Sequence, residues 1–78
     1  MIPVVNDCPE AVFSFVRQDQ HSKIFIVLNL SDTKRQVTFQ GTLFEGEYHR
    51  MFEGGKETMT KLSTLSLLTW DYRIYISV

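Results

Sequence analysis

Residues Lys23 to Leu30 read KIFIVLNL, and this run is the strongest structural signal in the chain. Its residues are apolar on both alternating faces, which is typical of a central β-strand. One face of such a strand packs on a second sheet, and the other face needs a further cover. A free two-layer sandwich usually has polar outer faces, so the run also predicts an exposed apolar patch or a docking surface.

Short segments with strand composition lie on both sides of this run and are separated by turn residues. They are Ala11–Arg17, Arg35–Gln40, Glu47–Phe52, a weak strand at Glu57–Thr60, Thr64–Leu68 and Tyr72–Val78. Glu53–Lys56 predicts a hairpin turn, because its paired glycines favour positive φ angles. None of the segments has a sustained helical period. The pattern predicts an all-β fold, an antiparallel two-layer β-sandwich of six to eight short strands with Greek-key connections.

The domain is expected over residues 11–78, with residues 1–10 as an N-terminal tail or linker. A chain of 78 residues has room for one hydrophobic core. Its net charge of -1 gives no electrostatic reason to expect nucleic acid or a membrane as a partner. Its single cysteine, Cys8, excludes an intrachain disulfide. The first residues lack the pattern of a signal peptide, and the compartment stays open.

The residues that could perform catalysis or bind a metal do not form a recognisable pattern. His21 falls in a predicted turn, His49 on the polar face of a strand, and Cys8 beside a proline. These three residues form neither a nucleophile with an adjacent base nor a set with the spacing of metal ligands. We therefore expect no catalytic residue, no cofactor and no metal in this chain.

Three carboxylates and one sequon match functional patterns but have plainer interpretations. Glu45, Glu47 and Glu53 lie near one another, and paired carboxylates perform glycoside hydrolysis, but their positions favour solvated side chains. Asn29-Leu30-Ser31 matches the N-glycosylation pattern inside the strand expected to be most buried, so we interpret the match as chance.

The aromatic residues near the end of the chain are the remaining candidates for binding. Trp70, Tyr72 and Tyr75 could form a platform on which sugars stack, although core packing is the commoner fate of such residues. Tyr48 and Trp70 are the candidate sugar-contacting residues.

The order of these segments resembles the C-terminal β-domain of the α-amylase family of glycoside hydrolases over nearly the whole chain. The matching pieces, in order, are Val12–Arg17, Ile24–Asp32, Val37–Phe39, Gly46–Tyr48, Phe52–Gly55, Leu65–Trp70 and Ile74–Tyr75. The chain departs from the pattern at Thr69, where the family often has proline before the aromatic residue.

The resemblance implies a non-catalytic accessory domain that packs on a (β/α)8 catalytic barrel and stabilises it. A barrel needs roughly 200 residues or more, so the catalytic residues of the family have no counterpart here. The expected core is Ile24, Ile26, Leu28, Phe39, Leu65, Leu67 and Ile74. The partners implied are the barrel of a parent enzyme and, through an exposed apolar face, a second copy of the chain. The alternative is a carbohydrate-binding module that contacts α-glucan through surface aromatics.

Overall fold

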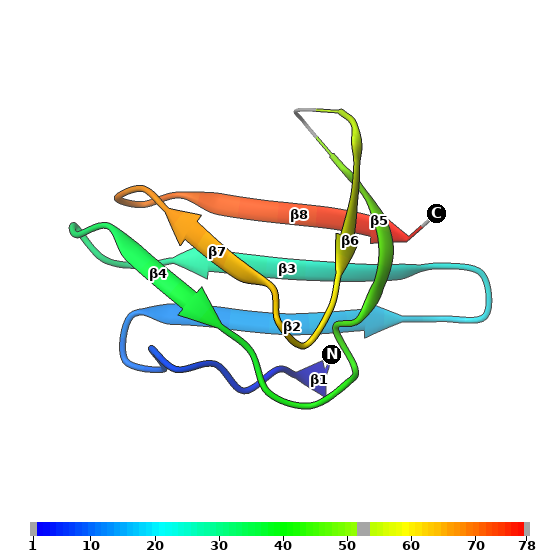
Figure 1. The fold of residues 1–78 in the computed structure, drawn as a ribbon, viewed down its shortest axis with the longest axis horizontal. Helices are drawn as coiled ribbons and strands as arrows, with labels where there is room; N and C mark the ends of the chain where they lie inside the picture. The colour runs from blue at the N-terminus through cyan, green and yellow to red at the C-terminus, as the bar shows by residue number, and fades with distance from the viewer. Residues whose placement is uncertain (1, 52–53, 78) are drawn as a thin grey trace.

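The computed structural model describes residues 2–51 and 54–77, and its regular elements are strands throughout these ranges (Figure 1). They are β1 (Ile2–Pro3), β2 (Val12–Gln18), β3 (Lys23–Asn29), β4 (Arg35–Thr38), β5 (Gly46–Arg50), β6 (Lys56–Met59), β7 (Thr64–Leu67) and β8 (Tyr72–Ser77). The all-β prediction is confirmed. The two-residue strand β1 was not expected, and part of the hairpin predicted at Glu53–Lys56 lies outside the described residues. Gly54 and Gly55 have φ angles of 72° and 79°, as a tight turn requires.

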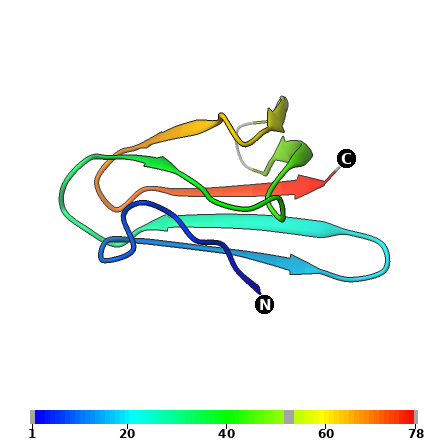
Figure 2. The ribbon, with the colours of Figure 1, turned by 60° about the horizontal axis from the view of Figure 1, so that its bottom comes forward.

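The strands form a large sheet in the order β1-β2-β3-β8-β5-β6 and a small sheet in which β4 pairs with β7. All pairings are antiparallel. The chain leaves the large sheet after β3 to form β4, and again after β6 to form β7. Strands distant in sequence, such as β3 and β8, therefore become neighbours. Figure 2 shows the small sheet as a separate layer over β2, β3 and β8, which confirms the two-layer sandwich.

From Ile2 onward, the segment expected to be a tail or linker packs into the fold. Ile2 pairs with Val16, and the side chains of Val4 and Asn6 are buried. The Asn6 amide donates to the Val12 carbonyl at 3.1 Å and to the Ser14 hydroxyl at 2.9 Å. These bonds satisfy polar groups inside the protein and tie the segment to β2.

The core lies between the two sheets and is rich in aromatic rings. Phe25 of β3 packs at its centre, with ring centroids 5.2 Å from Phe39, 5.8 Å from Phe44 and 5.9 Å from Tyr75. The prediction that Phe39, Leu65 and Leu67 belong to the core is confirmed.

The prediction of the core face of β3 is wrong. Phe25 and Val27 are fully buried, whereas Ile24, Ile26 and Leu28 are only partly buried and lie on the opposite face of the strand. Ile74 of β8, opposite Ile26, shares that outer position. The strand is apolar on both faces, so alternation alone does not say which face meets the second sheet.

Candidate functional site: the outer face of the large sheet

The face of the large sheet that points away from β4 and β7 carries a continuous row of apolar side chains. The register places Phe13 opposite Leu28 and Phe15 opposite Ile26. On the other side of β3, Ile26 lies opposite Ile74 and Ile24 opposite Ile76. We call this set the outer face; it consists of Phe13, Phe15, Ile24, Ile26, Leu28, Ile74 and Ile76.

Strand β2 is largely apolar on both faces, and its inner face carries the buried residues Val12, Ser14 and Val16. Phe13 is 51% exposed and Phe15 is partly buried, while Ser14 between them is buried and donates to the Val4 carbonyl at 2.6 Å. The two phenyl rings contact each other edge to face at 5.2 Å between centroids. Both phenyl rings of β2 thus lie on the outer face, and an exposed apolar patch of this kind is typical of an interaction surface.

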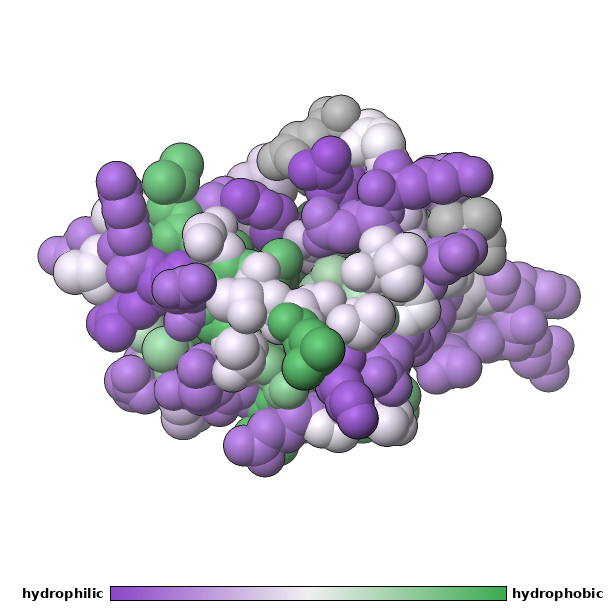
Figure 3. Space-filling model, viewed as in Figure 1, coloured by the Kyte–Doolittle hydropathy of each residue, from purple (hydrophilic) through white to green (hydrophobic). Residues whose placement is uncertain are grey.

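The outer face becomes polar toward β5 and β6. His49 lies opposite Ile76 on one side and opposite Lys56 on the other, and Glu47 lies opposite Thr58. All four polar residues are exposed. Figure 3 shows the other side of the molecule, the side of β4 and β7, which is largely hydrophilic with separate apolar spots. The sheet thus combines an apolar area over β2, β3 and β8 with a polar border.

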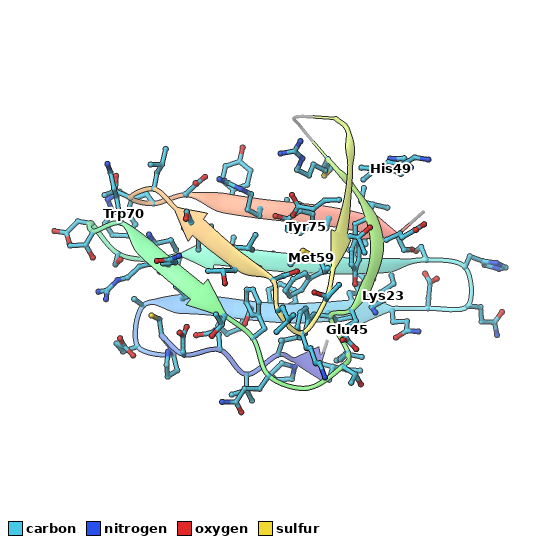
Figure 4. All side chains as sticks on the ribbon, in the orientation of Figure 1. Lys23, Glu45, His49, Met59, Trp70 and Tyr75 are labelled. Atoms are coloured by element: carbon cyan, nitrogen blue, oxygen red, sulfur yellow. The ribbon has the colours of Figure 1, made fainter. Side chains whose placement is uncertain are left out.

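A second exposed feature is the turn Leu68-Thr69-Trp70-Asp71, which joins β7 to β8 at one end of the molecule (Figure 4). The Asp71 amide donates to the Leu68 carbonyl at 3.1 Å and closes a four-residue turn. Trp70, at its third position, has a φ of 55° and is 64% exposed. A positive φ at this position belongs to a type II turn, where glycine is the favoured residue. A tryptophan held there with its ring largely in solvent adds backbone strain to the fold.

Hydrogen bonds from three sides hold this turn in place. The Trp70 amide donates to the Ser31 carbonyl at 3.1 Å, and the buried Asn29 amide group donates to the Leu68 carbonyl at 2.8 Å. The Asp71 carboxylate accepts from the Leu68 amide at 3.1 Å and the Tyr72 amide at 2.8 Å. These bonds hold the backbone in the turn conformation although its third residue is tryptophan and not glycine.

The Asp71 carboxylate also pairs with the Arg73 guanidinium at 2.7 Å. Partial burial alone would raise the pKa of Asp71, but the hydrogen bonds from Leu68, Arg73 and Tyr72 outweigh it and lower the pKa below its ordinary value. The charged form of Asp71 is therefore the one that the folded turn prefers.

The side chains considered for catalysis form no reactive site among the described residues. His21 is exposed in the turn between β2 and β3, and His49 lies on the border of the outer face. Cys8 packs against the core, and its burial raises the thiol pKa, which disfavours the reactive thiolate. Across residues 2–51 and 54–77, no three His, Cys, Asp or Glu side chains are grouped to bind a metal. Over the same ranges, no helix is suited to crossing a membrane.

The structure describes Glu45, Glu47 and the sequon residue Asn29. The Glu45 carbonyl accepts from the Lys23 ammonium at 2.9 Å, and the two residues lie side by side in Figure 4. Glu47 is exposed on β5, and Glu53 lies outside the described residues. The side-chain nitrogen of Asn29 is buried and donates to both Thr33 and Leu68, which leaves it unavailable to a glycan in the folded protein.

The candidate sugar-contacting residues differ in accessibility. Tyr48 is fully buried, its hydroxyl donates to the Phe44 carbonyl at 2.9 Å, and burial raises its pKa to about 12. Its ring presents no face to solvent, which corrects the expectation of a sugar contact there. Tyr75 also packs in the core, whereas Trp70 and Tyr72 are exposed, contrary to the core packing expected for them. Trp70 is therefore the candidate of the original pair that remains accessible.

Sequence reasoning missed two groups of functional residues. Phe13 and Phe15 were assigned to a strand but not to a surface, although an aromatic pair around an inward serine was a usable signal. Asn29 holds the exposed turn through a hydrogen bond to Leu68, far away in the sequence, and nothing local marks it; Asp71 holds the turn through bonds to its near neighbours Leu68 and Tyr72.

Comparison with known proteins supplies the family. The family model described as "Alpha amylase, C-terminal all-beta domain" matches residues 4–71. The match begins at Val4, in agreement with the packed N-terminal segment. A search of curated proteins finds no match. The chain therefore belongs to the C-terminal all-β domain family of α-amylases, a family of non-catalytic accessory domains that normally pack against the catalytic barrel of α-amylase-type enzymes.

Proposed function

We propose that this domain acts by packing its outer face on the surface of a (β/α)8 catalytic barrel outside the 78 residues, which it shields and stabilises. The observation that carries the proposal is the row of seven apolar side chains on β2, β3 and β8. The helices that surround such a barrel offer a complementary surface, and the apolar contact area drives association.

The distribution of polarity supports one orientation of the contact. The apolar centre over β2, β3 and β8 is the part that a partner covers and from which it excludes water. The border formed by Glu47, His49, Lys56 and Thr58 is the part that stays near water. Stable protein interfaces have this arrangement of an apolar core and a polar rim.

In the absence of the barrel, the same surface favours pairing with a second copy of the chain. Two outer faces brought together around a twofold axis would cover each other's apolar rows. Self-association is therefore the expected behaviour of the chain in isolation and a competitor of barrel docking.

The test begins with the gene. The DNA that precedes the codon for Met1 is read, and the barrel that it encodes is expressed alone and together with residues 1–78. We expect the domain to raise the melting temperature of the barrel, and Ile26→Lys to abolish this gain because it places a charge at the centre of the outer face.

Trp70→Gly is the matched control, since it alters an exposed aromatic residue outside the outer face and should preserve the gain. A stop codon in frame immediately upstream would overturn the proposal, as would an Ile26→Lys variant that stabilises the barrel as well as the unmodified domain does.

A further inference from the structure

We infer that the outer face receives a single α-helix of about two to three turns, which lies along β3 between β2 and β8. The inference rests on the proposed docking to a barrel and goes further, because it names the element that makes the contact and the direction in which it lies. Three features of the large sheet carry it: the exposure of the side chains beside β3, the width of the apolar area and its length.

The first row of the outer face has an aromatic ring on each side of β3. Phe13 of β2 lies opposite Leu28, and Tyr72 of β8 lies opposite Leu28 on the other side, so all three side chains share this face. Phe13 is 51% exposed and Tyr72 is 49% exposed, whereas Leu28 between them is partly buried. A partner that contacts both rings is therefore centred on β3.

The other two rows have apolar side chains on the same strands. We call the three rows together the apolar strip; it consists of the outer face and Tyr72. Neighbouring strands are about 4.8 Å apart, so the strip is about 10 Å wide from β2 to β8. An α-helix with its side chains is about 10–12 Å across. The strip therefore has the width of one helix.

The strands beyond β8 do not widen the strip. On this side of the sheet, β5 and β6 carry the exposed polar residues Glu47, His49, Lys56 and Thr58. A second helix beside the first would lie about 8–10 Å away and would cover these polar groups. Figure 1 also shows β5 and β6 running steeply across the direction of β2, β3 and β8. A straight helix aligned with these three strands therefore diverges from β5.

The length of the strip limits the length of the helix. Successive rows are two residues apart along each strand, so three rows span about 13 Å. The third row is bordered by exposed Arg17, opposite Ile24, and by exposed His49, opposite Ile76. About nine helical residues cover this distance, and residues four apart on a helix recur about every 6 Å, close to the spacing of the rows. We therefore expect apolar residues at positions i, i+4 and i+8 of the helix to face the strip.

The area of the strip favours a helix of the barrel over a second copy of the chain. With its side chains included, the strip covers on the order of 300 Å², well below the roughly 800 Å² that each partner buries in a stable complex. Two copies that pair through the strip should therefore associate only weakly. A barrel joined to the domain in one polypeptide needs less area, because the link keeps the two at a high effective concentration.

Hydroxyl-radical footprinting tests the inference, because it measures the exposure of individual side chains. The 78-residue chain and the full polypeptide that joins it to the barrel are oxidised and compared by mass spectrometry. Phe13, Tyr72 and Met51 are matched probes, since they are 51%, 49% and 52% exposed in the domain. We expect Phe13 and Tyr72 to lose most of their reactivity in the full polypeptide.

Met51 is the control, because it lies on the same side of the sheet but outside the strip. It follows His49 by two residues, and its amide donates to the Ile74 carbonyl at 2.9 Å. One helix along β3 leaves Met51 in solvent, so its oxidation should be unchanged. Variants of the full polypeptide should show the same contrast: Phe13→Lys and Tyr72→Lys should lower the melting temperature of the barrel, whereas Met51→Lys should not.

The inference is overturned if Met51 is protected as strongly as Phe13, since the contact is then wider than one helix. It is also overturned if Phe13 or Tyr72 keeps its reactivity, or if the 78-residue chain is a stable dimer that protects both, which would make a second copy the occupant. Protection of Met51 together with barrel stabilisation that Ile26→Lys removes would leave docking intact and refute only the single helix. A gene that encodes no barrel would refute both proposals.

Discussion

At the scale of single residues, Trp70 shows how a side chain and its backbone conformation can be in conflict. The turn requires a positive φ, and the sequence provides an aromatic residue where glycine would be relaxed. The family pattern often has proline at the preceding position, which suits the second residue of a type II turn. Here that position is Thr69, so neither of the two residues preferred by the turn is present.

Replacing Trp70 with glycine should therefore stabilise the folded protein. Relief of the left-handed conformation outweighs the greater entropy of glycine in the unfolded chain, and we expect a gain of about 0.5–1 kcal/mol. Urea unfolding followed by circular dichroism measures it. Trp70→Ala is the control and should give no such gain. A large loss of stability in the glycine variant would show that the indole packs as a structural residue.

Asp71 gives the turn a dependence on acid. Its pKa is lowered in the folded state, so its contribution is complete above the unfolded-state value near 3.8 and is lost as the pH falls through the folded value. We expect Asp71→Asn to cost about 1–2 kcal/mol at neutral pH, through lost charge-assisted hydrogen bonds. The difference between the two proteins should shrink below pH 4 in urea titrations at several pH values. A constant difference across this range would contradict the assignment.

At the scale of the elements, β3 contributes one face to the core of the fold and the other face to the proposed docking surface. Its inner face, Phe25 and Val27, fills the sandwich, and its outer face, Ile24, Ile26 and Leu28, is left for a partner. Both faces have similar composition, but their burial differs. The two faces should therefore respond differently to the same chemical change.

Neighbouring residues of β3 allow a matched comparison. Val27→Lys puts an ammonium group into the core, and we expect the chain not to fold, because an unpaired charge cannot be buried there. Ile26→Lys puts the same group on the outer face, and the chain should fold and remain monomeric at higher concentration. Circular dichroism and analytical ultracentrifugation measure the two properties. If both variants unfold, the outer face is part of the core of the domain and is not a docking surface.

At the scale of the whole molecule, the small core relies on a cluster of aromatic rings that includes two tyrosines. Burial raises the pKa of Tyr48 to about 12 and raises the pKa of Tyr75 as well. The neutral tyrosines stabilise the fold fully below the unfolded-state value near 10, and this stability is lost as the pH rises toward the folded values.

We therefore expect the protein to lose stability progressively above pH 10, together with ionisation of the tyrosines followed by absorbance. Tyr48→Phe should reduce this alkaline loss, while costing about 1 kcal/mol at neutral pH through the missing bond to the Phe44 carbonyl. An unchanged alkaline transition in the variant would contradict the role of Tyr48.

The sequence by itself determined the all-β class, the seven longer strands to within about two residues at each end, and the family. These follow from local properties: alternation, turn residues and the order of short motifs. The run Lys23–Leu30 also predicted that the face of this strand opposite the second sheet is apolar. What it could not determine was which face of β3 points inward, because both are apolar and only the pairing with β2 and β8 against the small sheet decides between them.

Only the tertiary structure decided which aromatic residues are buried and how the N-terminal segment packs. Tyr48 and Tyr75 became core while Trp70 and Tyr72 became surface, because burial depends on which strands meet across the sandwich. Asn29 joined two distant segments through its side-chain hydrogen bond to the Leu68 carbonyl, which has no local signature. The turn that carries Trp70 is held by hydrogen bonds from Asn29 and Ser31, which lie about 40 residues earlier in the chain. Local sequence patterns do not predict contacts between segments so far apart.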